Sequence, residues 1–434
     1  GQGPQDMTPF AIKSIYARRV WDSRGRPTVE AEVILNDGAL GRAIAPAGAS
    51  KGTREALELR DGGDRFGGLD VMQAVGHINC EISTALVGTN ADNQSVLDQA
   101  LIDLDGTMNK SRLGANATLA VSMAAAHAMA VASGMPLYRY LGNGTIGRSP
   151  MPQIQIFGGG AHAGRRVDVQ DFMVVCPGAT SFAQALEWTA EVYRHAGLLM
   201  AQRCSLFGVA DEGGWWPDFS SNEQALEILV LAIERAGFIP GDQVAIALDI
   251  AASEFGRQGQ YRLGLESRAL DSDGMIEMLL GWIEKYPIVS IEDPLAEDDQ
   301  VGFSRFTKAI GHRLQIVGDD FLVSNSSLIR EAAGLGAANT VLLKPNQRGT
   351  LSETLQAWKV AQELGYSAIV SARSGETEDT TIVDLAIGWN VGQLKVGSFA
   401  RSERMIKWNH ALRIEEQLGA QARFAGSSVF RKTH

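Results

Sequence analysis

The chain has 434 residues, 45% of them hydrophobic and 21% charged, and its formal net charge is −11. A chain of this length exceeds one ordinary hydrophobic core, so two domains are expected, and one of them could be a large α/β barrel. The negative charge argues against a nonspecific nucleic-acid binder, because such proteins neutralise phosphates with lysine and arginine. The sequence offers no apolar run of the roughly 18–20 residues that span a bilayer, so no membrane partner is expected either.

The N-terminus and the cysteines bear on where the protein works. The residues before Met7 have neither the basic nor the apolar segment of a secretion signal, and Met7 is the expected native start. Cys80, Cys176 and Cys204 are far apart and lack the spacing of a metal site. This pattern predicts buried, unreactive thiols and a location in the reducing cytoplasm.

The N-terminal third of the chain carries signals for both strands and helices. Residues 12–35 contain two apolar segments on either side of the turn-forming residues 22–27, which predicts two strands. A helix is expected to begin at 55–60. Residues 115–132 have the alanine-rich composition of a closely packed, buried helix.

Pro136 and the glycines around Gly142 end this region and predict the boundary between two domains. We expect an N-terminal α+β domain over residues 7–145. The second domain is expected over residues 146–430.

Six apolar segments of the second domain alternate with helical stretches at the spacing of βα units. We expect strands at 245–248, 288–291, 314–317, 340–343, 368–370 and 393–396. Polar side chains lie at or near the end of each, namely Asp249, Glu292, Asp293, Asp319, Asp320, Lys344, Arg373, Ser374 and Lys395. Because the C-terminal ends of parallel strands converge on one face of a barrel, this pattern predicts an α/β barrel with an active site at that face.

Three consecutive strand ends carry the carboxylates Asp249, Glu292 and Asp319. Hard oxygen ligands of this number, with room for water and substrate, suit Mg²⁺. A single acid more often caps a helix or forms an ion pair. The shared position of all three favours the metal site.

Lys344 and Lys395 also lie at strand ends. A lysine at the mouth of a barrel and flanked by cations can act as a base, because such surroundings lower its pKa. Proton removal next to a carboxylate creates a dianion, which needs concentrated positive charge. Either lysine could instead only pair with a carboxylate, and this alternative is strongest for Lys395.

Three loops could reach the same site. Glu212, in a turn that ends in two glycines, is a candidate general acid. The glycine-rich residues 158–166 include His162 and Arg165, a combination that suits an anion clamp. Residues 47–52 form a second small-residue loop that could exclude water from a site, although an ordinary surface loop explains them equally well.

Motifs along the chain resemble those of enolases from about Tyr16 to Leu418. They are DSRGRPTVE, EALELRD, LDGTMNKSRLGAN, ADEGG, DIAASEF, YPIVSIEDPLAEDD, QIVGDD, LLKPNQ, RSGETEDT, ARSER and RIEEQL. The resemblance implies an α/β fold, an enolase-type (β/α)8 barrel with an N-terminal α+β capping domain. It also implies a homodimer or higher homo-oligomer.

The resemblance implies roles for single residues. Two bound Mg²⁺ ions are implied, and the matching ligands are Asp249, Glu292 and Asp319 for one ion and Ser50 for the other. Lys344 matches the base that removes the C2 proton of a phosphoglycerate, and Glu212 matches an acid that helps the C3 hydroxyl leave. The positions that match substrate contacts are His162, Arg373, Ser374 and Lys395.

Departures from the family pattern gather at the predicted site. Ala372 stands where enolases carry an active-site histidine, and Asp171 replaces a glutamate that works beside Glu212. Trp215 and Trp216 replace a smaller pair after the glycine turn. Positive charges are added at three loop positions, which are Lys51, Arg165 and Arg348.

These departures share a direction. The loss of a histidine and of one methylene enlarges the pocket and weakens the help given to a departing hydroxide. Phosphate is a better leaving group and mainly needs charge neutralisation. The pattern therefore favours a substrate larger and more anionic than 2-phosphoglycerate.

The resulting hypothesis is an Mg²⁺-dependent enzyme that makes an enolpyruvate from a phosphoglycerate by C2 proton abstraction and C3 elimination. The enolase-like carboxyphosphonoenolpyruvate synthase of phosphinothricin-type antibiotic pathways is the divergence that fits best, with a cytidylyl-activated phosphonoformate as co-substrate. The alternatives are an ordinary phosphopyruvate hydratase and a catalytically silent scaffold protein. A scaffold has no need for the retained metal ligands and base.

Overall fold

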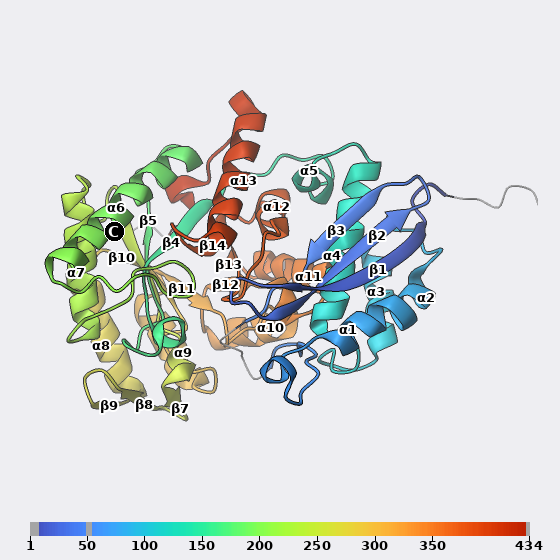
Figure 1. The fold of residues 1–434 in the computed structure, drawn as a ribbon. Coiled ribbons are helices and arrows are strands. Elements are labelled where there is room, and N and C mark those ends of the chain that lie inside the picture. The colour runs from blue at the N-terminus through green and yellow to red at the C-terminus, as the bar shows by residue number, and fades with distance from the viewer. Residues whose placement is uncertain (1–7, 49–53, 431–434) are drawn as a thin grey trace, which may run out of the picture.

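The computed structural model describes residues 8–48 and 54–430, which form a small sheet domain beside a large barrel (Figure 1). The small domain contains an antiparallel sheet of β1 (Ile12–Trp21), β2 (Pro27–Leu35) and β3 (Leu40–Ile44). The first two strands and the turn between them confirm the sequence prediction.

Five α-helices follow the sheet in the described part of the small domain. They are α1 (Met72–His77), α2 (Ser83–Leu86), α3 (Gln94–Asp105), α4 (Ala115–Ala132) and α5 (Leu137–Leu141). The helix expected at 55–60 is wrong, because this segment is irregular. Its backbone bonds distant loops instead, with Ala56 N–H donating to Gln347 and Leu57 N–H donating to Asn109.

Helix α4 is the core of the small domain and confirms the prediction of a buried helix. It is apolar and long enough to cross a membrane, yet 83% of it is buried inside the protein, where it packs against β2 and β3. Small residues permit this close packing. A Cβ added at Gly41 of β3 would collide with the backbone of Ala124 and Ala128.

The large domain is a closed barrel of eight strands. They are β4 (Met151–Gly158), β5 (Asp171–Val175), β6 (Ala245–Asp249), β10 (Ile288–Glu292), β11 (Gln315–Gly318), β12 (Thr340–Leu343), β13 (Ser367–Ser371) and β14 (Gln393–Ser398). The six strands expected from the sequence are confirmed, whereas β4 and β5 were not anticipated. Strand β5 runs antiparallel to both of its neighbours, β4 and β6.

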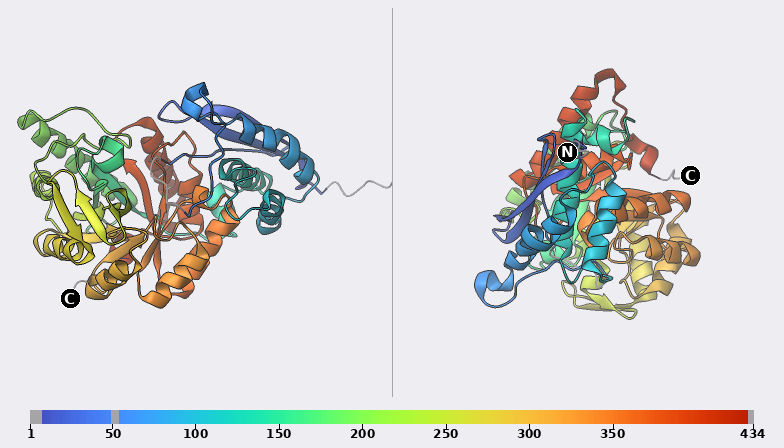
Figure 2. Two further views of the ribbon diagram at one scale, coloured as in Figure 1. Left: turned by 90° about the horizontal axis from the view of Figure 1, so that it is seen from below. Right: turned by 90° about the vertical axis from the view of Figure 1, so that its right-hand side faces the viewer.

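Helices surround the barrel, as the left view in Figure 2 shows. They are α6 (Phe182–Gln202), α7 (Asn222–Arg235), α8 (Ser272–Lys285), α9 (Gln300–Ile310), α10 (Ser326–Leu335), α11 (Leu351–Glu363), α12 (Thr381–Gly388) and α13 (Ser402–Leu418). Most begin at a Ser, Thr, Asp or Asn whose side chain accepts a backbone N–H, which fixes the helix start. A small sheet of β7 (Gly256–Arg257), β8 (Gln260–Leu263) and β9 (Arg268–Asp271) lies between β6 and α8.

The two domains are joined by hydrogen bonds close to the end of β13. Ala47 and Gly375 exchange two backbone hydrogen bonds of 2.9 and 2.7 Å. The Ile44 N–H donates to Asp379 at 2.9 Å. Because these loops follow the barrel strands, the small domain lies against the end of the barrel at which the predicted site residues gather.

The cysteines only partly match the expectation of buried thiols. Cys176 is buried, and burial raises the pKa of its thiol to about 12, so it is held in the unreactive form. Cys80 and Cys204 are exposed and free, which corrects the prediction for both.

Gly41→Ala should destabilise the small domain, because the new methyl group has no room between β3 and α4. Overpacking of this kind costs about 1–3 kcal/mol. Urea denaturation would measure the change in the free energy of unfolding. The matched control is Gly76→Ala in α1, where a Cβ meets nothing within 4 Å, so its effect should be neutral or stabilising by up to about 1 kcal/mol. Equal effects of both changes would contradict the close packing of α4.

Candidate active site

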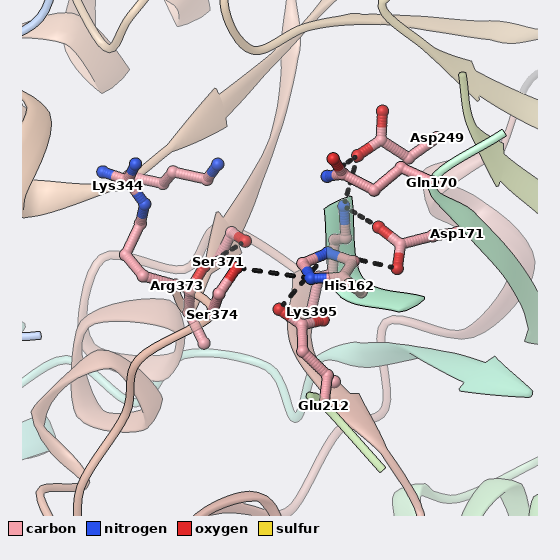
Figure 3. Close-up of a pocket in the computed structure, with 12 residues that line it drawn as sticks. His162, Gln170, Asp171, Glu212, Asp249, Lys344, Ser371, Arg373, Ser374 and Lys395 are labelled. Atoms are coloured by element: carbon pink, nitrogen blue, oxygen red, sulfur yellow. Dashed lines mark hydrogen bonds and ion pairs between the residues drawn. The ribbon is translucent and has the colours of Figure 1, made fainter. Parts of the chain in front are cut away.

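A cavity lies at the end of the barrel where most strands terminate (Figure 3). Most of the residues predicted for the site meet there. Its lining is His162, Gln170, Asp171, Glu212, Asp249, Lys344, Ser371, Ala372, Arg373, Ser374, Lys395 and Gly397. Its free volume is about 20 Å³, which is room for about one water molecule, because charged side chains fill the rest.

The reversed direction of β5 explains how Asp171 joins the site. Asp171 is the first residue of its strand, and it pairs in register with Gly158 at the end of β4 and with Asp249 at the end of β6. The start of an antiparallel strand therefore coincides with the ends of its neighbours. The expectation of a uniform series of parallel strands missed this element.

Three buried carboxylates form the acidic side of the site. Asp249 ends β6, Glu292 ends β10 and Asp319 directly follows β11, and their exposed fractions are 1%, 2% and 6%. Glu292 and Asp249 are register partners on adjacent strands. Glu292 Oε2 is fully buried and has no hydrogen-bond partner among the described residues.

Two lysines provide the opposite charge. Lys344 Nζ lies 2.7 Å from Asp319. Lys395 Nζ lies 3.0 Å from Glu292, 3.3 Å from Asp171 and 3.4 Å from Asp249. The structure thus bears out the lysine–carboxylate pairing that was weighed as an alternative, and it does so for both lysines.

These contacts raise the pKa values of both lysines, whereas the sequence predicted that they would be lowered. Burial lowers the pKa of Lys344, but the nearby charge of Asp319 outweighs it and the net pKa is raised. Burial likewise lowers the pKa of Lys395, and the charges of Glu292 and Asp249 raise it well above its usual value. A cation bound to the same carboxylates would remove the charge that holds both pKa values up.

The donor set fits Mg²⁺. Asp249, Glu292 and Asp319 offer hard oxygen atoms from three strand ends, and the unpartnered Oε2 of Glu292 is the kind of atom that a metal ion satisfies. These three residues would hold the ion. Burial raises the pKa of Glu292 to about 7, although Lys395 opposes this shift.

A second acidic cluster serves to position the first. Single carboxylate oxygens of Asp293, Asp319 and Asp320 lie within 4.8 Å of one another. Asp293 accepts the backbone N–H groups of Asp319 and Asp320 at 2.9 and 2.8 Å. It therefore fixes the loop that presents Asp319. Ser50, the expected ligand of another ion, lies outside the described residues, so that ion remains a prediction.

His162, Asp171 and Glu212 form a cluster on the other side of the cavity. His162 Nε2 lies 3.8 Å from each of the two carboxylates. Burial raises the pKa of Asp171, but the charges of Lys395 and His162 and a hydrogen bond from Gln155 leave it lowered overall. Asp171 therefore stays ionised beside His162 and Glu212.

Arg373 and Ser374 lie opposite the acids in an anion-binding position. Burial lowers the pKa of Arg373, but the charges of Glu55 and Glu58 outweigh it, so the guanidinium remains charged. Its Nη1 donates to Asn346 at 2.9 Å. Ser374 Oγ lies 3.4 Å from His162 Nδ1.

Ala372 also lines the cavity, so the substitution noted in the sequence lies at the site itself. Its N–H donates to the Lys395 carbonyl at 2.8 Å, which holds the ends of β13 and β14 together. The methyl side chain has nothing to donate or accept. His162 is the imidazole that remains among the described residues that line the cavity.

The added cations are not brought together. Arg348 bonds Glu353 of α11 at 3.1 Å instead of lining the cavity. Arg165 pairs with Glu254 at 3.0 Å and its side chain is 61% exposed. Lys51 lies outside the described residues. Of the two that the structure describes, Arg165 comes nearer the site, at a neighbouring groove.

Sequence reasoning missed several residues that hold the site in place. Arg404 is fully buried and donates to the backbone carbonyls of Arg373 and Ser374 at 2.8 and 2.6 Å. Gln170 donates to Asp249 at 3.2 Å, and Gln155 binds Asp171. Two signals pointed to them, because Gln170 adjoins Asp171 and Arg404 ends the ARSER motif.

Mg²⁺ should raise the melting temperature of the protein, because an ion that binds only the folded state stabilises it. At 100 times its Kd the stabilisation is about 2.7 kcal/mol. Glu292→Gln should abolish most of the Mg²⁺-dependent increase in a thermal-shift assay. Glu277→Gln on α8, whose side chain is exposed, is the control and should retain it. An undiminished increase in Glu292→Gln would exclude this donor set.

The affinity for Mg²⁺ should depend on pH. Glu292 must lose its proton to bind the ion, and its pKa in the metal-free protein is about 7. Burial and the charge of Glu292 also raise the pKa of the ligand Asp249, so affinity should rise with pH by at least about tenfold per unit below 7. Isothermal titration between pH 5.5 and 8.5 would test this. A constant affinity over that range would contradict a raised pKa for Glu292.

Comparison with protein families agrees with this geometry. The model of the enolase N-terminal domain matches residues 12–141. The model of the enolase C-terminal TIM barrel domain matches residues 148–433, which include the residues of the cavity. The chain therefore belongs to the enolase family.

Proposed function

We propose that the protein is an Mg²⁺-dependent lyase or transferase that forms an enolpyruvate from a phosphoglycerate. The observation that carries this proposal is the pairing of two buried lysines with carboxylates around one cavity, with Lys344 on Asp319 and Lys395 on Glu292. A small anionic substrate fits such a site, because Arg373 and Ser374 add anion-binding groups to the same wall.

In this proposal Lys344 removes the C2 proton. The lysine becomes available as a base when the charge of Asp319 is neutralised, since that charge is what raises its pKa. Bound Mg²⁺ supplies the positive charge that stabilises the developing negative charge, the combination of lysine and metal known in the enolase superfamily. Lys395 and Arg373 orient the carboxylate and the phosphate of the substrate. Two ions are expected, as in the family.

The finer proposal is carboxyphosphonoenolpyruvate synthase. The C2 hydroxyl of 3-phosphoglycerate attacks the phosphorus of cytidylyl-phosphonoformate, the bond to CMP breaks, and the hydroxyl proton passes to the solvent or to a carboxylate. Lys344 then takes the C2 proton, the C2–C3 double bond forms, and the C3–O bond breaks to release inorganic phosphate. The products are carboxyphosphonoenolpyruvate, CMP and phosphate.

The loss of the histidine at position 372 supports a changed reaction. Hydroxide is a poor leaving group that needs acid or metal help, whereas phosphate needs mainly charge neutralisation. Ala372 removes a potential acid from the cavity wall. The remaining cations, Arg373, Lys344 and Lys395, suit departing phosphate.

An ordinary phosphopyruvate hydratase is the second candidate. The observation that favours it is the cluster of His162, Asp171 and Glu212, which could still protonate a leaving hydroxide although Asp171 replaces the family's glutamate. A silent scaffold is the weaker alternative, since a buried cluster of charges costs stability without helping such a role. The free cysteines support a reducing compartment such as the cytoplasm. A homodimer is proposed because the chain belongs to the enolase family.

The first test compares two reactions of the purified protein with Mg²⁺. Ultraviolet absorbance would follow enolpyruvate formation from 2-phosphoglycerate alone, which we expect to be slow. Phosphorus NMR would follow cytidylyl-phosphonoformate with 3-phosphoglycerate, where we expect release of phosphate and a new phosphonate-ester resonance. Rapid turnover of 2-phosphoglycerate with no product from the second mixture would establish the ordinary hydratase.

Ala372→His should increase enolpyruvate formation from 2-phosphoglycerate by about 10²-fold, which is the lower range for one added acid–base group. Ala372→Leu adds similar bulk without a proton donor and should give no increase. Steady-state rates of both variants would check this. An equal response of the two variants would show that the size of the side chain, and not its chemistry, controls the reaction.

A further inference from the structure

A second, larger hollow lies beside the catalytic cavity. It has a volume of about 600 Å³ and is lined by residues of both domains. We call it the arginine groove, after its charged lining residues, which are Arg24, Arg26, Arg60 and Arg165 with Glu58 and Asp211. The function proposed above uses the catalytic cavity and gives this groove no role.

Two of the four arginines are satisfied by the protein. Arg60 Nη1 donates to two backbone carbonyls, and its Nη2 lies 3.2 Å from Glu58. Arg165 pairs with Glu254 at 3.0 Å. The charges of Arg60 and Arg165 are therefore already paired within the protein, and these side chains mainly shape the walls of the groove.

Arg24 is buried but poorly paired. Its side chain is only 9% exposed, and its Nε has no hydrogen-bond partner among the described residues. Its Nη2 donates a long hydrogen bond of 3.4 Å to the Ala47 carbonyl and lies 3.8 Å from Asp22, which is too far for a hydrogen bond. Burial and the neighbouring charge of Arg26 both lower the pKa of Arg24. A buried guanidinium with an unused donor is costly unless a ligand supplies an acceptor.

Arg26 adds a second available charge. It is exposed, lies two residues from Arg24 across the turn between β1 and β2, and forms no ion pair with any described residue. The charges of Asp22 and of the groove residues Asp211 and Glu58 only partly offset the effects of burial and of Arg26 on Arg24. Two adjacent guanidinium groups without full compensation form a site for a phosphate, which accepts several hydrogen bonds and carries negative charge.

The groove and the catalytic cavity share a wall. Asp211 lines the groove while its neighbour Glu212 lines the cavity. Asn346 donates a hydrogen bond of 3.4 Å to Glu58 of the groove. The same Asn346 accepts a hydrogen bond of 2.9 Å from Arg373 of the cavity. A ligand anchored in the groove would therefore lie within a few side chains of the reacting groups.

We propose that the arginine groove binds the phosphate of a nucleotide portion of a second substrate, whose reacting end enters the catalytic cavity. The identity of that nucleotide portion rests on the function proposed above, in which a nucleotidyl ester donates its phosphonoformyl group. The recognition itself rests on Arg24 and Arg26. Inorganic phosphate offers the same chemistry as a smaller ligand.

Isothermal titration with CMP, in EDTA and without phosphoglycerate, tests the groove apart from turnover. CMP should bind, cytidine should bind at least about tenfold more weakly, and inorganic phosphate should compete with CMP. Arg26→Gln should weaken CMP binding about tenfold or more. Arg26 is exposed, so this variant should fold normally, and a thermal melt would confirm it.

The matched control is Arg305→Gln, an exposed arginine of α9 paired with Asp273, which should change CMP affinity less than twofold. The inference is overturned if CMP does not bind, if cytidine binds as well as CMP, or if both variants weaken binding equally. Formation of phosphoenolpyruvate and of carboxyphosphonoenolpyruvate is measured separately on the same preparations. CMP binding without product formation would support the groove and refute the proposed reaction. Product formation with an unchanged CMP affinity in Arg26→Gln would support the reaction and overturn the groove.

Discussion

A buried network of opposite charges at one end of the barrel is the constraint on which the site depends. Lys344 pairs with Asp319, and Lys395 contacts three further carboxylates, which are Asp171, Asp249 and Glu292. Breaking a buried pair by removing one partner costs about 3–5 kcal/mol, so each group restrains the others. The members come from strands far apart in the chain, and only closure of the barrel brings them together.

The same network links binding to catalysis. Without a metal ion the carboxylates raise the pKa of both lysines, and a lysine held in this way is a poor base. An ion on the carboxylates would compete with the lysines for the same charges. Lys344 would then become a better base once an ion neutralises Asp319, which ties its activity to metal binding.

Much of this architecture could be predicted from the sequence, because apolar strands followed by polar residues have a direct structural meaning in barrels. Asp249, Glu292 and Lys344 were placed correctly at one face for that reason. The antiparallel β5 was missed, since strand direction depends on long-range pairing and not on local pattern. Arg348 was expected near the site from its position in a motif, but Glu353, five residues later, captures its side chain.

The most direct test of the central claim is hydrogen exchange at C2 of 2-phosphoglycerate, followed by proton NMR in D₂O with Mg²⁺. If Lys344 is the base, the wild-type protein should exchange the C2 hydrogen even where elimination is slow. Lys344→Met should abolish exchange while Mg²⁺ still raises its melting temperature. Exchange that persists in Lys344→Met, or its absence in the Mg²⁺-bound wild-type protein, would contradict the account.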